Sequence, residues 1–83
     1  MQRPRYKKGD EVSHIDNIGL KMRIRNIFHE EGRLVGIETS WFDGEKLKKE
    51  NFHSHELIPW AISKLGSERV DSYIKNVNDD FEL

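Results

Sequence analysis

Two segments in which apolar and polar residues alternate meet at the dipeptide Asp43-Gly44, and two large aromatics, Trp41 and Phe42, stand directly before it. Alternation with a period of two is typical of a half-buried β-strand. An Asp-Gly pair favours a two-residue hairpin loop, because both central residues need positive φ, which glycine adopts freely and aspartate tolerates. The sequence therefore predicts an antiparallel hairpin inside a small β-domain.

Further alternating segments extend this hairpin into a sheet. The predicted strands cover residues 11–15, 22–28, 34–41, 46–53 and 57–58. Residues 16–19 and Glu30-Glu31-Gly32 are predicted turns, and Pro59, which lacks an amide hydrogen, marks the end of regular pairing. In the second strand Met22, Ile24 and Phe28 are expected on the buried face.

The third strand is expected to be central and paired on both sides, with Val35, Ile37, Thr39 and Trp41 on one face. Five short strands with frequent turns are typical of a partly open SH3-like barrel. We therefore expect a mainly β fold, with a flexible arm over residues 1–5 and an SH3-like barrel over residues 6–60.

The pattern changes after Trp60, where residues 61–83 are predicted to form a helical extension with an acidic tail. Its apolar residues recur at i, i+3, i+4 and i+7: Val70, Tyr73, Ile74 and Val77. Ser67 is the expected cap of a helix of roughly eleven residues, too short to be stable alone. We expect it to dock on the barrel with help from Trp60, Ile62 and Leu65. The alternative is that this apolar stripe, or Phe81 and Leu83, binds a partner.

Composition excludes several classes of protein. The chain has 83 residues and no cysteine, so one hydrophobic core must stabilise it without disulfides, and a thiolate zinc site and a catalytic cysteine are excluded. No apolar run approaches the roughly 20 residues needed to cross a bilayer, and residues 1–5 lack the apolar segment of a signal peptide. We expect a cytoplasmic monomer without a membrane anchor.

The sequence offers little for catalysis or for a cofactor. Its serines stand outside a nucleophile-elbow pattern, there is no glycine-rich phosphate loop, and a barrel of this size has little room for a water-excluding pocket. His53 and His55 share a spacing that suits zinc, with His14 or Glu56 as a third ligand, but no second ligand pair is visible. We predict a protein that is not an enzyme and has no cofactor and no metal site.

Several residue blocks carry a family resemblance. They are Tyr6-Lys7-x-Gly9-Asp10-x-Val12, Gly19-x-Lys21-Met22-x-Ile24, Trp41-Phe42-Asp43-Gly44-x-Lys46-Leu47, Phe52 and Leu57. Over residues 6–58 the chain resembles the YodC-like small bacterial proteins of unknown function. The resemblance implies an SH3-like or Tudor-like barrel with no assigned activity. The chain departs from the family pattern at Ile18-Gly19-Leu20, where Gly-Gly-Pro is usual, and at Thr39, where a cysteine is common, which weakens any function tied to that loop or thiol.

The adjacent aromatics indicate a recognition surface. Neighbouring side chains on a strand point to opposite faces, so Trp41 and Phe42 cannot share one core, and one ring should be exposed. We expect an aromatic face that binds a protein or peptide. The candidate residues are Tyr6, Trp41, Phe42 and Phe52 for apolar contact, with Asp43 and Lys46 fixing orientation. The alternative is that the curled barrel or the helix covers the second ring.

A basic front end provides a second hypothesis. Residues 1–25 carry seven basic and three acidic groups, a net charge of +4, whereas the whole chain carries −1. The candidate contacts to RNA or DNA phosphates are Arg3, Arg5, Lys7, Lys8, Arg23 and Arg25, with Tyr6 interleaved. The overall pI of 6.4 and the acidic tail argue against this function.

Overall fold

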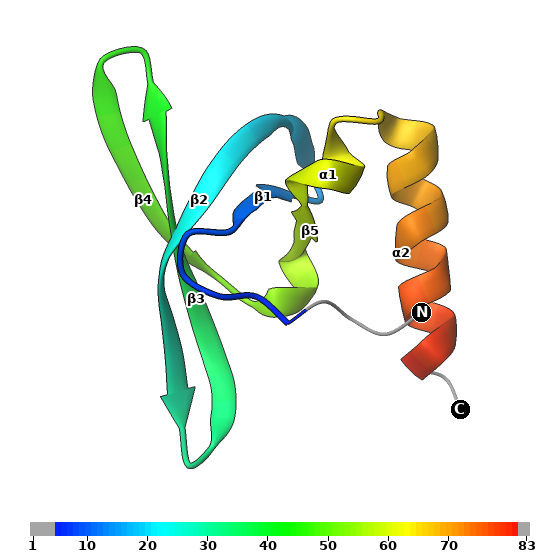
Figure 1. The fold of residues 1–83 in the computed structure, drawn as a ribbon, viewed down its shortest axis with the longest axis horizontal. Helices are drawn as coiled ribbons and strands as arrows, with labels where there is room; N and C mark the ends of the chain where they lie inside the picture. The colour runs from blue at the N-terminus through cyan, green and yellow to red at the C-terminus, as the bar shows by residue number, and fades with distance from the viewer. Residues whose placement is uncertain (1–4, 82–83) are drawn as a thin grey trace.

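The structure, a computed structural model, describes the backbone of residues 5–81 and the side chains of residues 5–76. Five antiparallel strands form one sheet in the order β4-β3-β2-β1-β5 (Figure 1). The strands are β1 (Glu11–His14), β2 (Asn17–Glu30), β3 (Arg33–Asp43), β4 (Lys46–Phe52) and β5 (Leu57–Pro59). A 3₁₀ helix η1 (Ser54–Glu56) precedes β5, and two α-helices follow it, α1 (Trp60–Ser63) and α2 (Ser67–Phe81). The predicted mainly β fold with a C-terminal helix is confirmed.

The long strand β2 joins two parts of the sheet. Its first part pairs with β1 from Asn17 to Arg23, and its second part pairs with β3 from Arg23 to Glu30. β2 bends between them, so that β3 and β4 lie on one side of the molecule and β1, β5 and the helices on the other (Figure 1). Within residues 5–81, β4 and β5 are the two edges of the sheet and do not pair with each other.

Two register shifts in the pairing of β2 with β3 change which side chains point to each face of the sheet. Met22 and Ile24 are buried, but the register shifts between Ile24 and Asn26, and the inward residue after the shift is Ile27, opposite Ile37. Phe28 consequently lies on the other face, 42% exposed, so its predicted place with Met22 and Ile24 is wrong. A β-bulge adds one residue to a strand and so reverses the alternation that a sequence pattern assumes.

A second shift lies between Phe28 and His29 and has the same kind of effect on β3. Phe28 is opposite Gly36 while His29 is opposite Leu34, which leaves Val35 without a partner of its own. Val35 is 42% exposed, whereas Ile37 and Thr39, which were expected on the same face, are buried. The central position of β3, between β2 and β4, is confirmed.

The two long hairpins use different turns. Asp43 pairs with Lys46, so the loop between β3 and β4 is Gly44-Glu45 rather than the predicted Asp43-Gly44. Of these two loop residues only Gly44 has positive φ, at 64°, the pattern of a type II′ turn. The pattern predicted there, with positive φ at both loop residues, occurs instead in the β2–β3 hairpin at Glu31 (φ 53°) and Gly32 (φ 77°).

The predicted loop over residues 16–19 is wrong. β2 begins at Asn17, which pairs with His14, so the turn contains only Ile15 and Asp16. The buried Ser13 hydroxyl donates a hydrogen bond to the carbonyl oxygen of Leu20 at 2.6 Å, holding the strand where the sequence has a glycine. Asparagine and glycine here belong to a strand because tertiary contacts outweigh their weak local preference.

The core is formed by side chains of the five strands and of the segment before β1. Its buried members are Val12, Met22, Ile24, Ile37 and Leu57, with Tyr6, Leu20, Ile27, Trp41 and Phe52 packed against them. The buried Thr39 hydroxyl is satisfied, because it donates to the carbonyl oxygen of Glu50 at 3.1 Å. Burying a hydroxyl without such a partner would be destabilising.

The helices attach to the sheet in series. α1 packs against β1, β5 and β2, and the buried Ser63 hydroxyl donates to the carbonyl oxygen of Ile18. α2 packs mainly against α1, and its Val70 is buried. The carbonyl of Gly66 accepts the first helical hydrogen bond, from the amide of Val70, so Gly66 rather than Ser67 occupies the cap position.

Two expectations about the extension are corrected. Leu65 is 57% exposed and does not help the helix to dock. α2 has 15 residues and runs to Phe81, so most of the expected acidic tail is helical. The side chains of Val77 and Phe81, and all of Leu83, lie outside the described residues.

Candidate functional site: the open face of β2, β3 and β4

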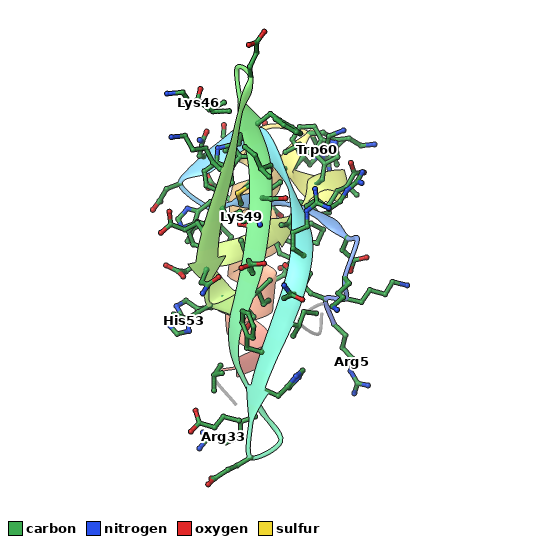
Figure 2. All side chains as sticks on the ribbon, turned by 90° about the vertical axis from the view of Figure 1, so that its left-hand side faces the viewer. Arg5, Arg33, Lys46, Lys49, His53 and Trp60 are labelled. Atoms are coloured by element: carbon green, nitrogen blue, oxygen red, sulfur yellow. The ribbon has the colours of Figure 1, made fainter. Side chains whose placement is uncertain are left out.

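One face of the β2–β3–β4 sheet carries no helix. In Figure 1 the helices all lie on the side toward β1 and β5, and in Figure 2 the opposite side faces the viewer, with Lys49 near its middle. Strand register assigns residues to this surface, which we call the open face. It contains Phe42 opposite Leu47, Ser40 opposite both Arg23 and Lys49, Glu38 opposite both Asn26 and Asn51, and Gly36 opposite Phe28.

An exposed apolar pair occupies one end of the open face. Phe42 is 66% exposed and Leu47, its register partner on β4, is 47% exposed. The preceding residue, Trp41, is half-buried and packs against the core. The prediction that these two rings lie on opposite sides of the strand is confirmed, and Phe42 is the exposed one.

The middle of the open face is polar and mainly basic. The Arg25 side chain donates through Nε to the buried Ser40 hydroxyl at 2.6 Å. Arg23 and Lys49 flank Ser40 on the neighbouring strands. The nearby Glu38 carboxylate accepts a hydrogen bond from the Asn26 amide at 2.9 Å. These three cations therefore outnumber the acidic groups on this part of the face.

A second exposed ring stands at the other end. Phe28 lies opposite Gly36, and a β-carbon placed on Gly36 would be 3.8 Å from the Phe28 ring. This is ordinary van der Waals contact, so the Phe28 ring lies beside Gly36 of β3. The open face thus has an aromatic ring at each end and cations between them.

The structure does not bring the six predicted protein-binding residues onto one surface. Tyr6 and Phe52 pack against the core, as Trp41 does, and the Tyr6 hydroxyl donates to the carbonyl oxygen of Leu57 at 3.1 Å. Asp43 and Lys46 are register partners at the exposed hairpin tip, on the same side of the strands as Trp41. Of the predicted set only Phe42 belongs to the open face.

Sequence reasoning missed Leu47 and misplaced Phe28. The signal for Leu47 was present, because residues equidistant from a hairpin turn face each other, and Leu47 is the apolar residue nearest to Phe42 across the turn. The signal for Phe28 was hidden by the bulge.

The predicted nucleic-acid strip is also divided. Arg23 and Arg25 lie on the open face, whereas Lys7 and Lys8 are exposed in the segment before β1, where the Lys7 amide donates to the Asp10 carboxylate at 3.0 Å. Arg5 borders a separate hollow, and Arg3 lies outside the described residues.

That hollow has a volume of about 370 Å³ and lies beside α1. It is lined by Arg5, Tyr6, Asp10, Glu11, Pro59, Trp60, Ala61 and Lys64. The Glu11 carboxylate is 3.2 Å from the Lys21 ammonium, which in turn lies 5.8 Å from the centre of the Trp60 ring. The carboxylates of the hollow are thus already engaged within the chain, and cations and anions are mixed along its wall.

Three of the four histidines, His14, His53 and His55, lie at or beside η1. The backbone N–H of His53 donates to the Glu56 carboxylate at 2.8 Å, and the Glu56 amide donates back to the carbonyl of His53 at 3.0 Å. The hydrogen bond from the His53 backbone N–H to the carboxylate lowers the pKa of Glu56, with a smaller contribution from His14, and burial opposes this effect. The rings of His53 and His55 stack with centroids 5.5 Å apart. Among the described residues no three His, Cys, Asp or Glu side chains are grouped so as to hold a metal ion.

Comparison with protein-family models, with curated proteins and with solved structures finds no match to this chain. Among the described residues no helix has both the length and the apolar character that a membrane span requires.

Proposed function

We propose that this protein is a non-enzymatic interaction module that binds a protein or peptide through the open face, with Phe42 as the central contact. The observation that carries the proposal is the pairing of Phe42 with Leu47 on a surface that no helix covers. An exposed aromatic beside a second apolar residue and a rim of cations is typical of an interface, where aromatic and arginine side chains provide most of the binding energy.

We further propose that the sheet is an SH3-like barrel of the YodC-like kind. Five short antiparallel strands with tight turns, and a long β2 that serves both parts of the sheet, support this interpretation. The bulges in the β2–β3 ladder support it as well, because bulges increase strand twist and are common at the rims of barrels.

Replacement of Phe42 by alanine tests the binding surface. Because the ring is mostly exposed, we expect the free energy of unfolding to change by less than about 0.5 kcal/mol. Proteins captured from the native cell by the wild-type chain should be lost from the variant, as identified by mass spectrometry. The matched control is Trp41→Ala, which we expect to lower the free energy of unfolding by about 2 kcal/mol, or roughly 10 °C in Tm.

Two results would contradict the proposal. A large loss of stability in Phe42→Ala would make the ring a structural residue. Unchanged capture with unchanged stability would remove Phe42 from any binding surface.

A second candidate function is binding of single-stranded RNA or DNA. It is favoured by the placement of Arg23, Arg25 and Lys49 on the same face as Phe42 and Phe28, because cations that contact phosphates and rings that stack on bases are the usual elements of such a surface. Titration of a labelled oligonucleotide at increasing salt separates the two functions. Three phosphate contacts predict a slope of log K against log salt of about −2, and absence of binding at low salt excludes the function.

A further inference from the structure

We propose that the free edge of β4 pairs in antiparallel orientation with an extended acidic segment of a partner protein, which adds a strand to the sheet. The segment carries acidic, acidic, apolar and acidic residues opposite Lys49, Lys48, Leu47 and Lys46. This inference rests on the proposed function and specifies the class of partner that the open face and its edge recognise.

The first observation is that the edge of β4 is open along its length. β4 ends the sheet on one side, and within residues 5–81 its only strand partner is β3. All its residues from Lys46 to Asn51 are exposed, and only Phe52 turns into the core. An edge strand leaves every second pair of backbone N–H and C=O groups without a sheet partner, and an extended peptide can satisfy them.

The second observation is the charge of this edge. Lys46, Lys48 and Lys49 stand against one acidic residue, Glu50. None of the three lysines forms an ion pair with a side chain that the structure describes, whereas Lys21 is paired with Glu11. Edge lysines disfavour pairing of β4 with a like-charged strand, and the same charge favours an acidic one, because cross-strand pairs of opposite charge are stabilising.

The third observation sets the order of residues in the partner. Leu47 and Lys49 point to the open face, and Lys46 and Lys48 point to the other side. The partner residue opposite Leu47 therefore lies beside the Phe42–Leu47 pair, where an apolar side chain would pack against these two exposed residues. Antiparallel pairing continues the geometry of the rest of this sheet.

The chain itself contains this order of residues at Asp79-Asp80-Phe81-Glu82. A second copy of the chain is therefore a competing occupant. In the structure, however, residues 79–81 belong to α2, so their backbone would have to leave the helix before pairing with β4. A segment already extended in a partner protein avoids this cost, and we therefore assign the edge to a partner.

The test uses synthetic ten-residue peptides with a central Glu-Glu-Val-Glu block, titrated into the full-length protein and followed by the backbone amide NMR signals of β4. Two isomers carry N-methyl groups on alternate residues, one set on the amides that would face β4 and the other on those that would face solvent. We expect the first isomer to bind at least tenfold more weakly and the second to bind within about threefold of the unmethylated peptide, since only one row of amides pairs with the edge. Equal binding of the two isomers would overturn the inference.

A charge exchange gives a second test. The variant Lys48→Glu/Lys49→Glu should prefer a Lys-Lys-Val-Lys peptide over the acidic peptide by tenfold or more, reversing the preference of the wild type. Its matched control, Lys64→Glu, changes an exposed lysine beside α1 and should keep the wild-type preference. The substituted positions are exposed, so both proteins should keep their thermal unfolding temperature. A double variant that still prefers the acidic peptide would overturn the inference.

Sedimentation at increasing protein concentration tests the competing occupant. A dimer in the wild type that is lost in Asp79→Lys/Asp80→Lys would show that a second copy occupies the edge, and would overturn the assignment to a partner. A monomer at all concentrations supports the assignment.

The peptide-binding experiments on the β4 edge and the capture experiment on Phe42→Ala can fail independently of each other. If Phe42→Ala abolishes capture of cellular proteins while both methylated isomers bind alike, the open face remains and the edge inference fails. If the isomers differ as expected and Phe42→Ala changes neither capture nor peptide binding, edge pairing remains and the role of Phe42 fails.

Discussion

The two faces of β3 differ in almost every respect. On the inner face Ile37 and Thr39 are buried and Trp41 packs against the core, whereas on the open face Glu38 is hydrogen-bonded to Asn26 and Phe42 is mostly exposed. Neighbouring residues of one strand thus lie in different surroundings, the inner ones against the core and Phe42 in solvent. Residue type alone therefore assigns no role here, since an aromatic residue lies on each face.

The largest expected effect tests the inner face. Ile37→Ala removes a fully buried side chain at the point where β2, β3 and β4 meet the core, so we expect the free energy of unfolding to fall by about 3 kcal/mol. Urea unfolding followed by tryptophan fluorescence measures it. The neighbour Glu38→Ala should lose less than about 1 kcal/mol, and equal losses would break the contrast between the two faces.

The hairpin that connects β3 to β4 gives the next effect. Gly44 has φ 64° with no atom near an added β-carbon, so Gly44→Ala should cost about 1 kcal/mol through backbone strain alone. Glu45→Ala, in the same loop without positive φ, should change stability by less than about 0.5 kcal/mol. Thermal unfolding of the two variants measures the difference, and a neutral Gly44→Ala would show that the turn is not the one described.

Arg25 is a residue of the open face that also contributes to stability. Arg25→Ala leaves the buried Ser40 hydroxyl without its donor, and we expect a loss of about 1 kcal/mol by chemical unfolding. Arg23→Ala, which removes an exposed cation on the same face, should be close to neutral. If both variants are neutral, the hydrogen bond does not contribute to stability.

The smallest expected effect lies at η1, on the way from β4 to β5. The folded pKa of Glu56 is below its ordinary value of 4.5, so its stabilising contribution is present above that pH and is lost as the pH falls through the folded pKa. The Glu56→Gln variant should therefore be less stable than the wild type at neutral pH, and this difference should become smaller as the pH falls below about 4.5. Unfolding temperatures between pH 3 and pH 7 measure this, and a deficit that is constant with pH would contradict it.

The sequence was sufficient for features that depend on neighbouring residues. Period-two alternation located the five strands, and the opposite placement of Trp41 and Phe42 followed from strand geometry alone. The glycine after Asp43 correctly indicated a hairpin, although the strand pairing continued one residue further than the dipeptide suggested.

The remaining features depend on contacts between distant residues. The bulges that turn Phe28 outward and leave Val35 unpaired arise from pairing between β2 and β3 and leave no signature in either strand alone. Tyr6 joins the core because its hydroxyl reaches Leu57, which lies far along the chain. For this reason the predicted site combined core aromatics with one exposed ring, and the open face became visible only with the fold.

The bulge at Arg25 also limits how the length of β2 can vary. Before it the inward residues are even-numbered, as at Met22 and Ile24, and after it they are odd-numbered, as at Ile27. Deleting Arg25 would restore unbroken alternation and keep Ile27 inward and Phe28 on the open face. Single-residue insertions and deletions elsewhere in this strand should be poorly tolerated, because they reverse the inward and outward assignment of the side chains beyond them, whereas changes of two residues preserve it.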